Sequence, residues 1–390
     1  MKVTIIPAPL SGTMNIPPSK SYSHRALICA ALGGGEAVGV GNSADIRATA
    51  ACLSALKTGA AMDANESGST LRFMIPIALA VNGRLEIHGS KRLMERPLDD
   101  YFNIFNEQGI KYELKDSTLT AEGRLRGGDY RLRGDVSSQF ITGLLFALPM
   151  LENDSRIIIT TALESKAYVD MTVEVLKNFG IDIAENESGY YIKGGQRYHS
   201  GSYTVEGDFS QAGFFLAMGE VDCLSLNHAS IQGDRASVEV YRSMGMDIEE
   251  IPGGYRTNGR AVRPVTVDAA QIPDFVPVLA CVMATAEGES RIINAGRLRI
   301  KESDRLAAIA EELGKLGADV EEGADYLIIR GGKPLHGAEC SAHNDHRIAM
   351  ALATISPHVE GELTIDGAES VNKSMPDFWE RFKALGGRIK

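Results

Sequence analysis

The feature that most constrains the fold is a unit that recurs along the chain, in which a short β-type run follows an apolar helix and precedes a second helix. The clearest copies pair a β-type run with a later glycine-led run, at 154–158 with 180–183, 289–293 with 317–320, and 361–365 with 386–389. Weaker copies begin near Glu36, Arg84 and Asp222, which makes six in all. Each copy reads β-α-β-α-β-β, so the sequence predicts an α/β fold built from repeated units.

The two helices of each unit differ in their apolar pattern. Leu306, Ile309 and Leu313 follow helical spacing, with Glu311 and Glu312 between them, so this second helix has one apolar face. The first helices are apolar nearly all round, which predicts that they are buried. They begin near Ser19, Ser69, Ser137, Ser210, Pro273 and Asp345. Units that mix strands and helices favour compact domains of three units each over a solenoid.

Length, charge and cysteine content narrow the class of protein. A chain of 390 residues is too long for one comfortable core, so we expect two domains. The formal net charge of −11 argues against nucleic acid or an anionic membrane as a partner. The five cysteines show no C-x-x-C spacing, which predicts buried, reduced thiols. With no leader-like segment and no apolar run of transmembrane length, we expect a cytoplasmic protein.

Polar residues collect where the predicted helices begin. The stretch from Ser19 to Arg25 places hydroxyls and two cations at a helix start, where backbone N–H groups and the helix dipole favour an anion. The same stretch also suits a plain N-cap followed by solvated charges. Seven cations recur at such starts: Lys20, Arg25, Arg96, Lys301, Arg305, Arg347 and Lys373. In an acidic protein this recurrence favours an acidic ligand.

Two carboxylates lie among these cations. Asp274 follows Ile272-Pro273 and precedes an apolar helix, and Glu302 lies between Lys301 and Arg305. A carboxylate beside a cation can be positioned for proton transfer, although charge balance explains the same pattern. The partly buried setting makes Asp274 the better candidate.

Several familiar chemistries lack their motifs. The sequence contains no G-x-x-x-x-G-K-[ST] loop, no G-x-G-x-x-G after a strand, no H-E-x-x-H and no cysteine-histidine metal spacing. His24 and His346, each followed by arginine, are interpreted as orienting groups. We expect neither a metal nor an organic cofactor.

Taken together, the motifs resemble those of the EPSP synthase family, the 3-phosphoshikimate 1-carboxyvinyltransferases, from Pro18 to about Pro376. The matching segments are Ser19-Lys20-Ser21 with Arg25, Gly68 with Arg72, Glu95-Arg96-Pro97, Ser137-Ser138-Gln139, Ser165 with Tyr168, Ile272-Pro273-Asp274, 301–305, 344–347 and Lys373. The resemblance implies two similar domains, each of three β-α-β-α-β-β units, with the active site in the interdomain cleft. The first would take residues 1–18 and 206–390, and the second residues 19–205.

The resemblance also implies the substrates and the residue roles. The family joins phosphoenolpyruvate to the 5-hydroxyl of shikimate 3-phosphate and releases phosphate. Shikimate 3-phosphate would be bound by Lys20, Ser21, Arg25, Ser137, Ser138, Gln139, Ser165, Asp274 and Lys301. Phosphoenolpyruvate would be bound by Lys20, Gly68, Arg96, Gln139, Arg305, Arg347 and Lys373. Asp274 would act as general base and Glu302 as proton donor, with Lys20 assisting.

The sequence also has three alternative functional interpretations. The related UDP-N-acetylglucosamine enolpyruvyl transferase uses a reactive cysteine on a loop that here, at 89–97, has none. RNA 3′-terminal phosphate cyclase shares a related fold but fits the acidic charge poorly. A non-catalytic anion-binding protein would need the cations but neither Asp274 nor Glu302. The chain departs from the usual family residues at His24, Phe73 and Arg297. We expect a monomer.

Overall fold

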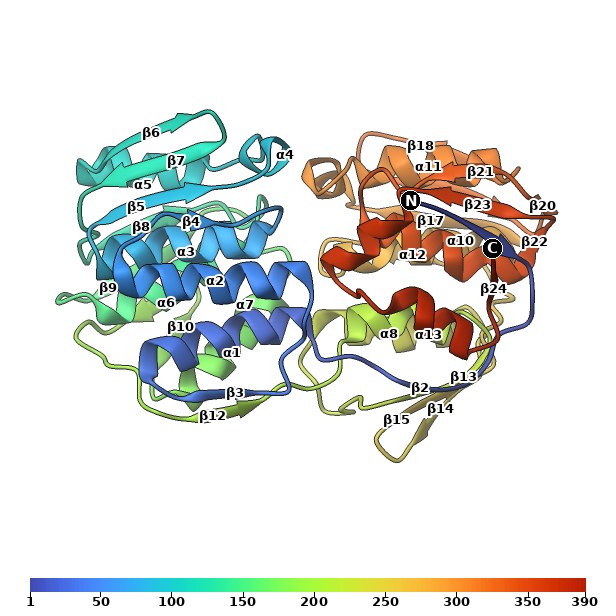
Figure 1. Ribbon diagram of the computed structural model, residues 1–390, viewed down its shortest axis with the longest axis horizontal. Helices are drawn as coiled ribbons and strands as arrows, with labels where there is room; N and C mark the ends of the chain where they lie inside the picture. Colours follow the sequence, from blue (N-terminus) through green and yellow to red (C-terminus); the bar gives the residue numbers. More distant parts are fainter. The chain divides into compact units, whose positions relative to one another are not determined.

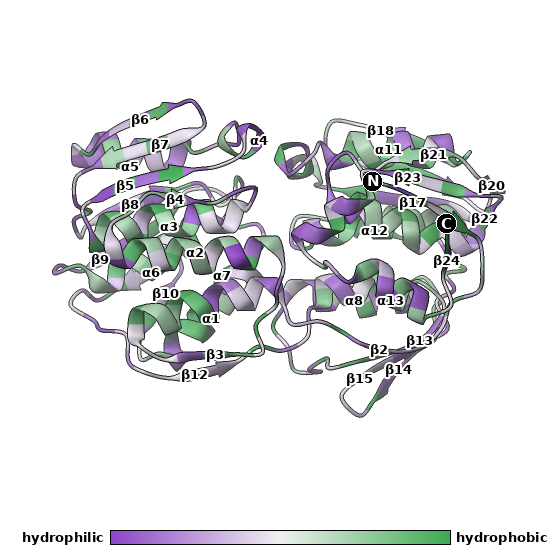
Figure 2. Cartoon of the chain, viewed as in Figure 1, coloured by the Kyte–Doolittle hydropathy of each residue, from purple (hydrophilic) through white to green (hydrophobic).

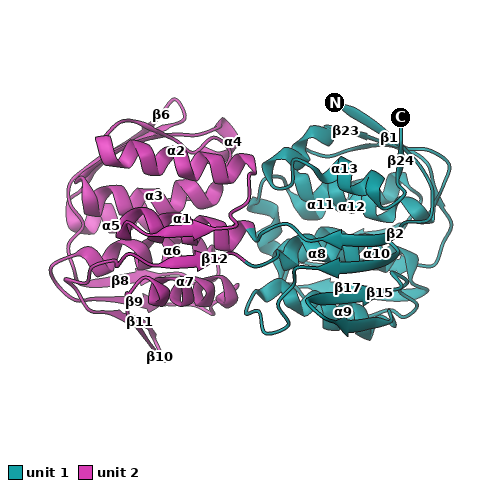
Figure 3. Ribbon diagram, turned by 60° about the horizontal axis from the view of Figure 1, so that its bottom comes forward, with its two compact units in different colours: residues 1–19, 206–390 teal, residues 20–205 magenta.

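The computed structural model describes residues 1–390, which form two compact units. Unit 1 comprises residues 1–19 and 206–390, and unit 2 comprises residues 20–205 (Figure 3). Within each unit the helices lie together and the sheets lie around them (Figure 1). The mixed α/β fold predicted from the repeats is therefore present, with the apolar helices forming the interior of each unit.

Unit 1 contains three four-stranded sheets, one for each β-α-β-α-β-β unit. The first sheet has the strand order β14 (Ile248–Ile251), β15 (Gly254–Thr257), β13 (Glu220–Leu224) and β2 (Ser11–Asn15). The second has the order β16 (Thr266–Asp268), β17 (Gly288–Ile293), β19 (Leu327–Gly331) and β18 (Asp319–Glu322). The third has the order β21 (Glu339–Ser341), β23 (Leu363–Asp366), β1 (Lys2–Ile6) and β24 (Arg388–Ile389). The helices are α8 (Phe209–Leu216), α9 (Ala236–Ser243), α10 (Val276–Thr285), α11 (Arg305–Lys315), α12 (His346–Ile355) and α13 (Phe378–Ala384). A short parallel pair, β20 (Leu335–His336) with β22 (Val359–Glu360), lies outside the three sheets.

Unit 2 contains two four-stranded sheets and one two-stranded sheet. In sheet order the strands are β4 (Met62–Asp63), β5 (Arg84–His88), β7 (Thr118–Glu122) and β6 (Lys111–Lys115); β10 (Ile183–Asn186), β11 (Gly189–Ile192), β9 (Ser155–Ile159) and β8 (Asp129–Leu132); and β12 (Ser202–Thr204) with β3 (Glu36–Val38). The helices are α1 (Lys20–Gly33), α2 (Ala44–Thr58), α3 (Gly68–Val81), α4 (Lys91–Met94), α5 (Asp99–Gln108), α6 (Ser138–Ala147) and α7 (Lys166–Asn178).

One of the six predicted units is incomplete. The unit formed by β12, α1, β3 and α2 has no closing hairpin, because α2 ends at Thr58 and the next unit begins with β4 at Met62. The left-handed Gly59 (φ 69°) ends α2, and its N–H bonds to Ala55 and Leu56. The expectation of six complete β-α-β-α-β-β copies is therefore wrong for this one, which we call the truncated unit.

The first helix of each unit is buried, as its composition predicts. Nine of the ten residues of α10 are buried, and α3 and α6 pack against each other in the interior of unit 2. Hydropathy coloured on the ribbon shows apolar residues concentrated on these inner helices and polar residues on the loops and outer strands (Figure 2). Each fully buried large apolar side chain contributes on the order of 1.5–3 kcal/mol of transfer free energy. This burial fixes the helix starts that carry the polar motifs.

The cysteines and the helix lengths agree with the sequence analysis. All five cysteines are buried and unpaired, which confirms the predicted reduced thiols. No helix in the structure is both long enough and apolar enough to cross a membrane.

Candidate functional site

In unit 1 the predicted site residues lie at helix starts that are capped by aspartates. Asp304 accepts a hydrogen bond from the Ala307 N–H at the start of α11. Asp345 accepts one from the Arg347 N–H at the start of α12. Asp274 lies in a 3₁₀ turn, η3 (Pro273–Phe275), directly before α10. The packing of α10, α11 and α12 thus brings the polar starts of these three helices together.

Asp274 is the meeting point of three cations. Its Oδ1 accepts from Arg305 Nη1 at 2.9 Å and lies 3.5 Å from Lys301 Nζ. Its Oδ2 accepts from Arg347 Nη2 at 3.0 Å, and its backbone carbonyl accepts from Arg347 Nη1 at 2.9 Å. The side chain keeps 21% of its surface exposed, whereas that of Arg305 is 1% exposed. The carboxylate is therefore accessible while its partners hold it in one orientation.

Arg305 connects the two candidate proton-transfer groups. Besides Asp274, its guanidinium donates to Glu302 Oε2 at 2.8 Å and to Asp345 Oδ2 at 2.8 Å. Burial alone would lower the pKa of Arg305, but Asp345 and Glu302 outweigh it and raise that pKa above its usual value. Burial alone would raise the pKa of Asp345, yet Arg305 holds it below the usual range. This part of unit 1 is a buried, charge-balanced ion network.

Two lysines border the network. Burial lowers the pKa of Lys301 to about 8, against the opposing effect of Asp274. Lys373, at the end of the 3₁₀ segment η6 (Ala368–Lys373), donates from Nζ to the Asn344 carbonyl at 2.5 Å. Asn344 directly precedes Asp345, so Lys373 is held beside the same helix start.

In unit 2, Arg72 meets an amide and a backbone carbonyl. Arg72 donates to Gln139 Oε1 at 3.3 Å and to the Pro97 carbonyl at 2.9 Å. Gln139 Nε2 donates to Ser69 Oγ at 3.0 Å. A Cβ on Gly68 would lie 2.8 Å from Arg96 Nη1, so the missing side chain lets this arginine approach the start of α3. The four predicted positions Gly68, Arg96, Ser138 and Gln139 therefore lie around two neighbouring helix starts, those of α3 and α6.

The remaining predicted residues of unit 2 lie at the starts of α1, α6 and α7. Lys20 Nζ donates to Asp45 Oδ2 at 2.8 Å. Arg25 is 2% exposed and donates to Thr172 Oγ1 and to the carbonyls of Ser21 and Tyr168. Burial lowers its pKa to about 10. Ser137 caps α6, and Ser165 begins α7 in a left-handed conformation (φ 56°). Arg25 thus ties α1 to α7 through the Thr172 hydroxyl and the Tyr168 carbonyl.

A chain of hydroxyl groups that the sequence analysis missed joins three helices of unit 2. Thr70 Oγ1 donates to Ser67 Oγ at 2.7 Å, so Thr49 Oγ1, 2.6 Å away, must donate to Thr70. His24 Nδ1, 2.7 Å from Thr49 Oγ1, must then carry the proton and donate. Burial lowers the pKa of His24 well below its usual value, which agrees with a neutral ring. The orienting role expected for His24 is supported by this geometry.

His24 also contacts Phe73, another position that the sequence analysis singled out. The rings of His24 and Phe73 meet edge to face, with centroids 6.3 Å apart and planes at 87°. The Arg25 guanidinium lies over the same Phe73 ring, 5.6 Å from its centroid. Spacing along the chain did not reveal this contact, because positions 24 and 73 lie on different helices.

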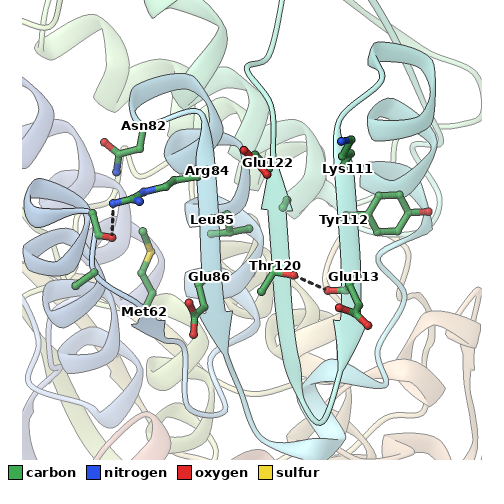
Figure 4. A pocket seen from close by; sticks show the side chains of 13 residues that line it. Met62, Asn82, Arg84, Leu85, Glu86, Lys111, Tyr112, Glu113, Thr120 and Glu122 are labelled. Carbon is green, nitrogen blue, oxygen red and sulfur yellow. Dashed lines mark hydrogen bonds between the residues drawn. The ribbon is translucent and has the colours of Figure 1, made fainter.

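One clear surface hollow in unit 2 lies away from the predicted site residues. It occupies about 580 Å³ over the sheet that contains β5, β6 and β7, and its lining includes Arg84, Glu86 and Lys111 (Figure 4). Arg84 is turned toward the Gly59 carbonyl, which accepts from its Nη2 at 3.3 Å. None of the predicted catalytic or binding residues lines it.

Known proteins resemble the whole chain. It is 45% identical over 420 residues to the 3-phosphoshikimate 1-carboxyvinyltransferase of Clostridium perfringens, covering 100% of this chain and 99% of that protein. It is 46% identical over 416 residues to the enzyme of the same name from Clostridium kluyveri, with 99% and 98% covered. The EPSP synthase structure from Acinetobacter baumannii has a similar fold, with a TM-score of 0.79, 23% identity, and 100% of this chain and 99% of that chain covered.

The family model matches the chain in two segments. The model of EPSP synthase (3-phosphoshikimate 1-carboxyvinyltransferase) matches residues 5–66 and 58–382, two segments that overlap where α2 ends and β4 begins. The alignment with the Clostridium perfringens protein runs over 420 residues, although this chain has 390. The match extends over nearly the full chain, and the protein belongs to the EPSP synthase family.

Proposed function

We propose that the protein transfers the enolpyruvyl group of phosphoenolpyruvate to the 5-hydroxyl of shikimate 3-phosphate and releases inorganic phosphate, a step in the synthesis of aromatic amino acids. Family membership supports this activity over the full length of the chain. The observation that supports it most directly is that Asp274 and Glu302 share the guanidinium of Arg305. An acid and a base held by one buried cation suit a reaction that needs two proton transfers.

The proposed reaction is an addition followed by an elimination. Asp274 takes the proton of the 5-hydroxyl while that oxygen bonds to the enol carbon of phosphoenolpyruvate. Glu302 gives a proton to the methylene carbon, which becomes a methyl group. The tetrahedral intermediate then loses a proton from this methyl group, the double bond re-forms, and the bond to phosphate breaks. Lys20 assists proton movement, and the arginines stabilise the charge on the phosphate.

We propose that both units supply substrate-binding groups. In unit 2, Ser137, Ser138 and Ser165 bind the phosphate of shikimate 3-phosphate, and Ser21 and Arg25 bind its carboxylate. Gln139, Lys301 and Asp274 orient its ring and hydroxyls. The phosphoenolpyruvate ligands are Lys20, Gly68, Arg96, Gln139, Arg305, Arg347 and Lys373. Helix starts such as those of α3 and α6, where the first backbone N–H groups have no acceptor within the helix, are suited to phosphate oxygens.

The proposal also states which cofactors the reaction needs, in which compartment the protein acts and in what oligomeric state. The reaction needs no metal or organic cofactor, because release of phosphate accompanies re-formation of the double bond. Five buried, unpaired thiols support a reducing compartment, and we propose the cytoplasm. A monomer suffices for the chemistry, since one chain carries all of the named groups.

The direct test is release of inorganic phosphate from phosphoenolpyruvate, with and without shikimate 3-phosphate. We expect release only when both are present, in a one-to-one ratio with the enolpyruvyl product detected by mass spectrometry. Release with UDP-N-acetylglucosamine instead would favour the related transferase. Binding of both anions with no release would favour a non-catalytic anion-binding protein.

A further inference from the structure

The segment that leads into α12 contains two consecutive residues in a left-handed conformation. His343 has φ 50° and Asn344 has φ 52°, and neither is glycine. This region is unfavourable for L-residues, with a cost of order 1–3 kcal/mol each, so neighbouring contacts must hold it. These two residues follow β21 and immediately precede Asp345, the cap of α12.

Helix α11 holds this segment at two places. Near one end, Arg305 Nε donates to Asp345 Oδ2 at 2.8 Å. Seven residues later, about two helical turns and roughly 10 Å along the axis, Glu312 is fully buried. Its Oε2 accepts from the Ser341 N–H at 3.0 Å, and its Oε1 lies 2.6 Å from His343 Nε2. Because an ionised carboxylate can only accept, Nε2 carries the proton and donates.

Lys315 supplies the positive charge that balances the Glu312 carboxylate. Lys315 Nζ lies 2.9 Å from Glu312 Oε1 and 2.8 Å from Glu311 Oε1. Glu311, Glu312 and His343 come close enough to suggest a metal site, but the ammonium of Lys315 bonds to both carboxylates. The His343 ring therefore has a holding role in this cluster rather than the role of a metal ligand.

The left-handed residues His343 and Asn344 position two hydrogen-bond acceptors of the ion network, the Asn344 carbonyl and the Asp345 carboxylate. The Asn344 carbonyl accepts from Lys373 Nζ at 2.5 Å. Asp345 accepts from the Arg305 guanidinium and from the Arg347 N–H. A change in the backbone at residues 343 and 344 would move both acceptors, and with them the cations Lys373, Arg305 and Arg347.

We propose that His343 is a positioning residue for phosphoenolpyruvate, acting through the buried Glu312 carboxylate to hold the left-handed turn that places Lys373 and Arg347. This inference rests on the proposed function, since those cations are its proposed phosphoenolpyruvate ligands. The His343 ring is engaged by Glu312 and is not one of the proposed substrate ligands. A misplacement of about 1 Å in such a group can change binding or turnover by up to roughly 100-fold, and a partial shift by about tenfold.

The test compares His343→Leu with His336→Leu, a histidine of the same unit whose side chain is 63% exposed. For His343→Leu we expect the KM for phosphoenolpyruvate to rise roughly tenfold while the KM for shikimate 3-phosphate stays within about twofold. His343→Gln keeps an N–H donor and should restore most of the affinity. His336→Leu should leave both constants unchanged. Equal changes in both constants, or no change in a folded His343→Leu, would overturn the inference.

A second measurement does not depend on turnover. Hydrogen exchange at the backbone amides of 343–348 should be faster in His343→Leu than in the parent protein and in His336→Leu, because the Arg347 N–H loses its fixed acceptor. Calorimetric titration with phosphoenolpyruvate should show the same roughly tenfold weakening. If the parent protein releases no phosphate, the proposed function fails, and these two measurements still decide the inference. Unchanged exchange or unchanged affinity would contradict it.

Discussion

The polar centres of the two units differ in how their charges are satisfied. In unit 1, Asp274, Glu302 and Asp345 bond directly to the guanidinium of Arg305, in a network that is largely buried. In unit 2, Arg72 and Arg25 bond to an amide, a hydroxyl and backbone carbonyls. A carboxylate can accept or give up a proton, whereas hydroxyl, amide and guanidinium groups can donate hydrogen bonds to an oxyanion. We therefore propose that unit 1 carries the proton-transfer groups beside its phosphoenolpyruvate ligands, and that unit 2 mainly binds oxyanions.

The largest effect should come from removing the proton acceptor of unit 1. Asp274→Asn keeps the size of the side chain but cannot take a proton, so we expect turnover to fall by roughly 10²–10⁴-fold with KM values within a few fold. Steady-state phosphate release measures both constants. Thermal unfolding of Asp274→Asn should be measured beside phosphate release, because Arg305 and Arg347 lose a charged partner in this variant.

Asp222→Asn is the matched control for this change. Asp222 also pairs with an arginine, Arg256, through contacts of 2.7 and 2.8 Å, but the Arg256 side chain is 58% exposed. Its turnover should equal that of the parent protein. If Asp274→Asn weakened substrate binding and left turnover intact, the assignment of proton transfer to unit 1 would be wrong.

A smaller effect, on binding rather than turnover, is expected from unit 2. Arg96→Ala removes a cation next to Gly68, and losing charge-assisted hydrogen bonds of about 1.5–3 kcal/mol should raise the KM for phosphoenolpyruvate roughly 10- to 100-fold. The KM for shikimate 3-phosphate should change little. Arg84→Ala is the control, because Arg84 lies on β5 and its guanidinium donates to the carbonyl of Gly59 at the end of α2. An unchanged KM in a folded Arg96→Ala would remove this arginine from the site.

The smallest expected effect is a pH dependence of shikimate 3-phosphate binding that comes from Lys301 of unit 1. Burial lowers the pKa of Lys301 to about 8, so its ammonium is present below that pH and is lost as pH rises through it. The KM for shikimate 3-phosphate should therefore rise about three- to tenfold between about pH 7 and 9.5. Lys301→Arg stays charged and should flatten this profile, while the exposed Lys333→Arg should keep it. A flat profile in the parent protein would contradict this role.

The helix starts could be predicted from the sequence because their determinants are local. A cap residue followed by an apolar run identifies the starts of α6 and α12, where Ser137 and Asp345 accept the expected backbone hydrogen bonds. The truncated unit could not be recognised in this way. The sequence predicts a weaker copy near Glu36, but a closing hairpin depends on pairing with a distant strand.

By itself the sequence determined the α/β class, the repeated units, the positions of the polar helix starts and the family. Only the tertiary structure decided which of these polar groups meet. Arg305 reaches carboxylates 31 and 40 residues away, and His24 reaches Thr49 and Phe73 on other helices. Spacing along the chain specifies which face of a helix a residue occupies. The packing of buried helices specifies which faces come within hydrogen-bonding distance, and that depends on the whole core.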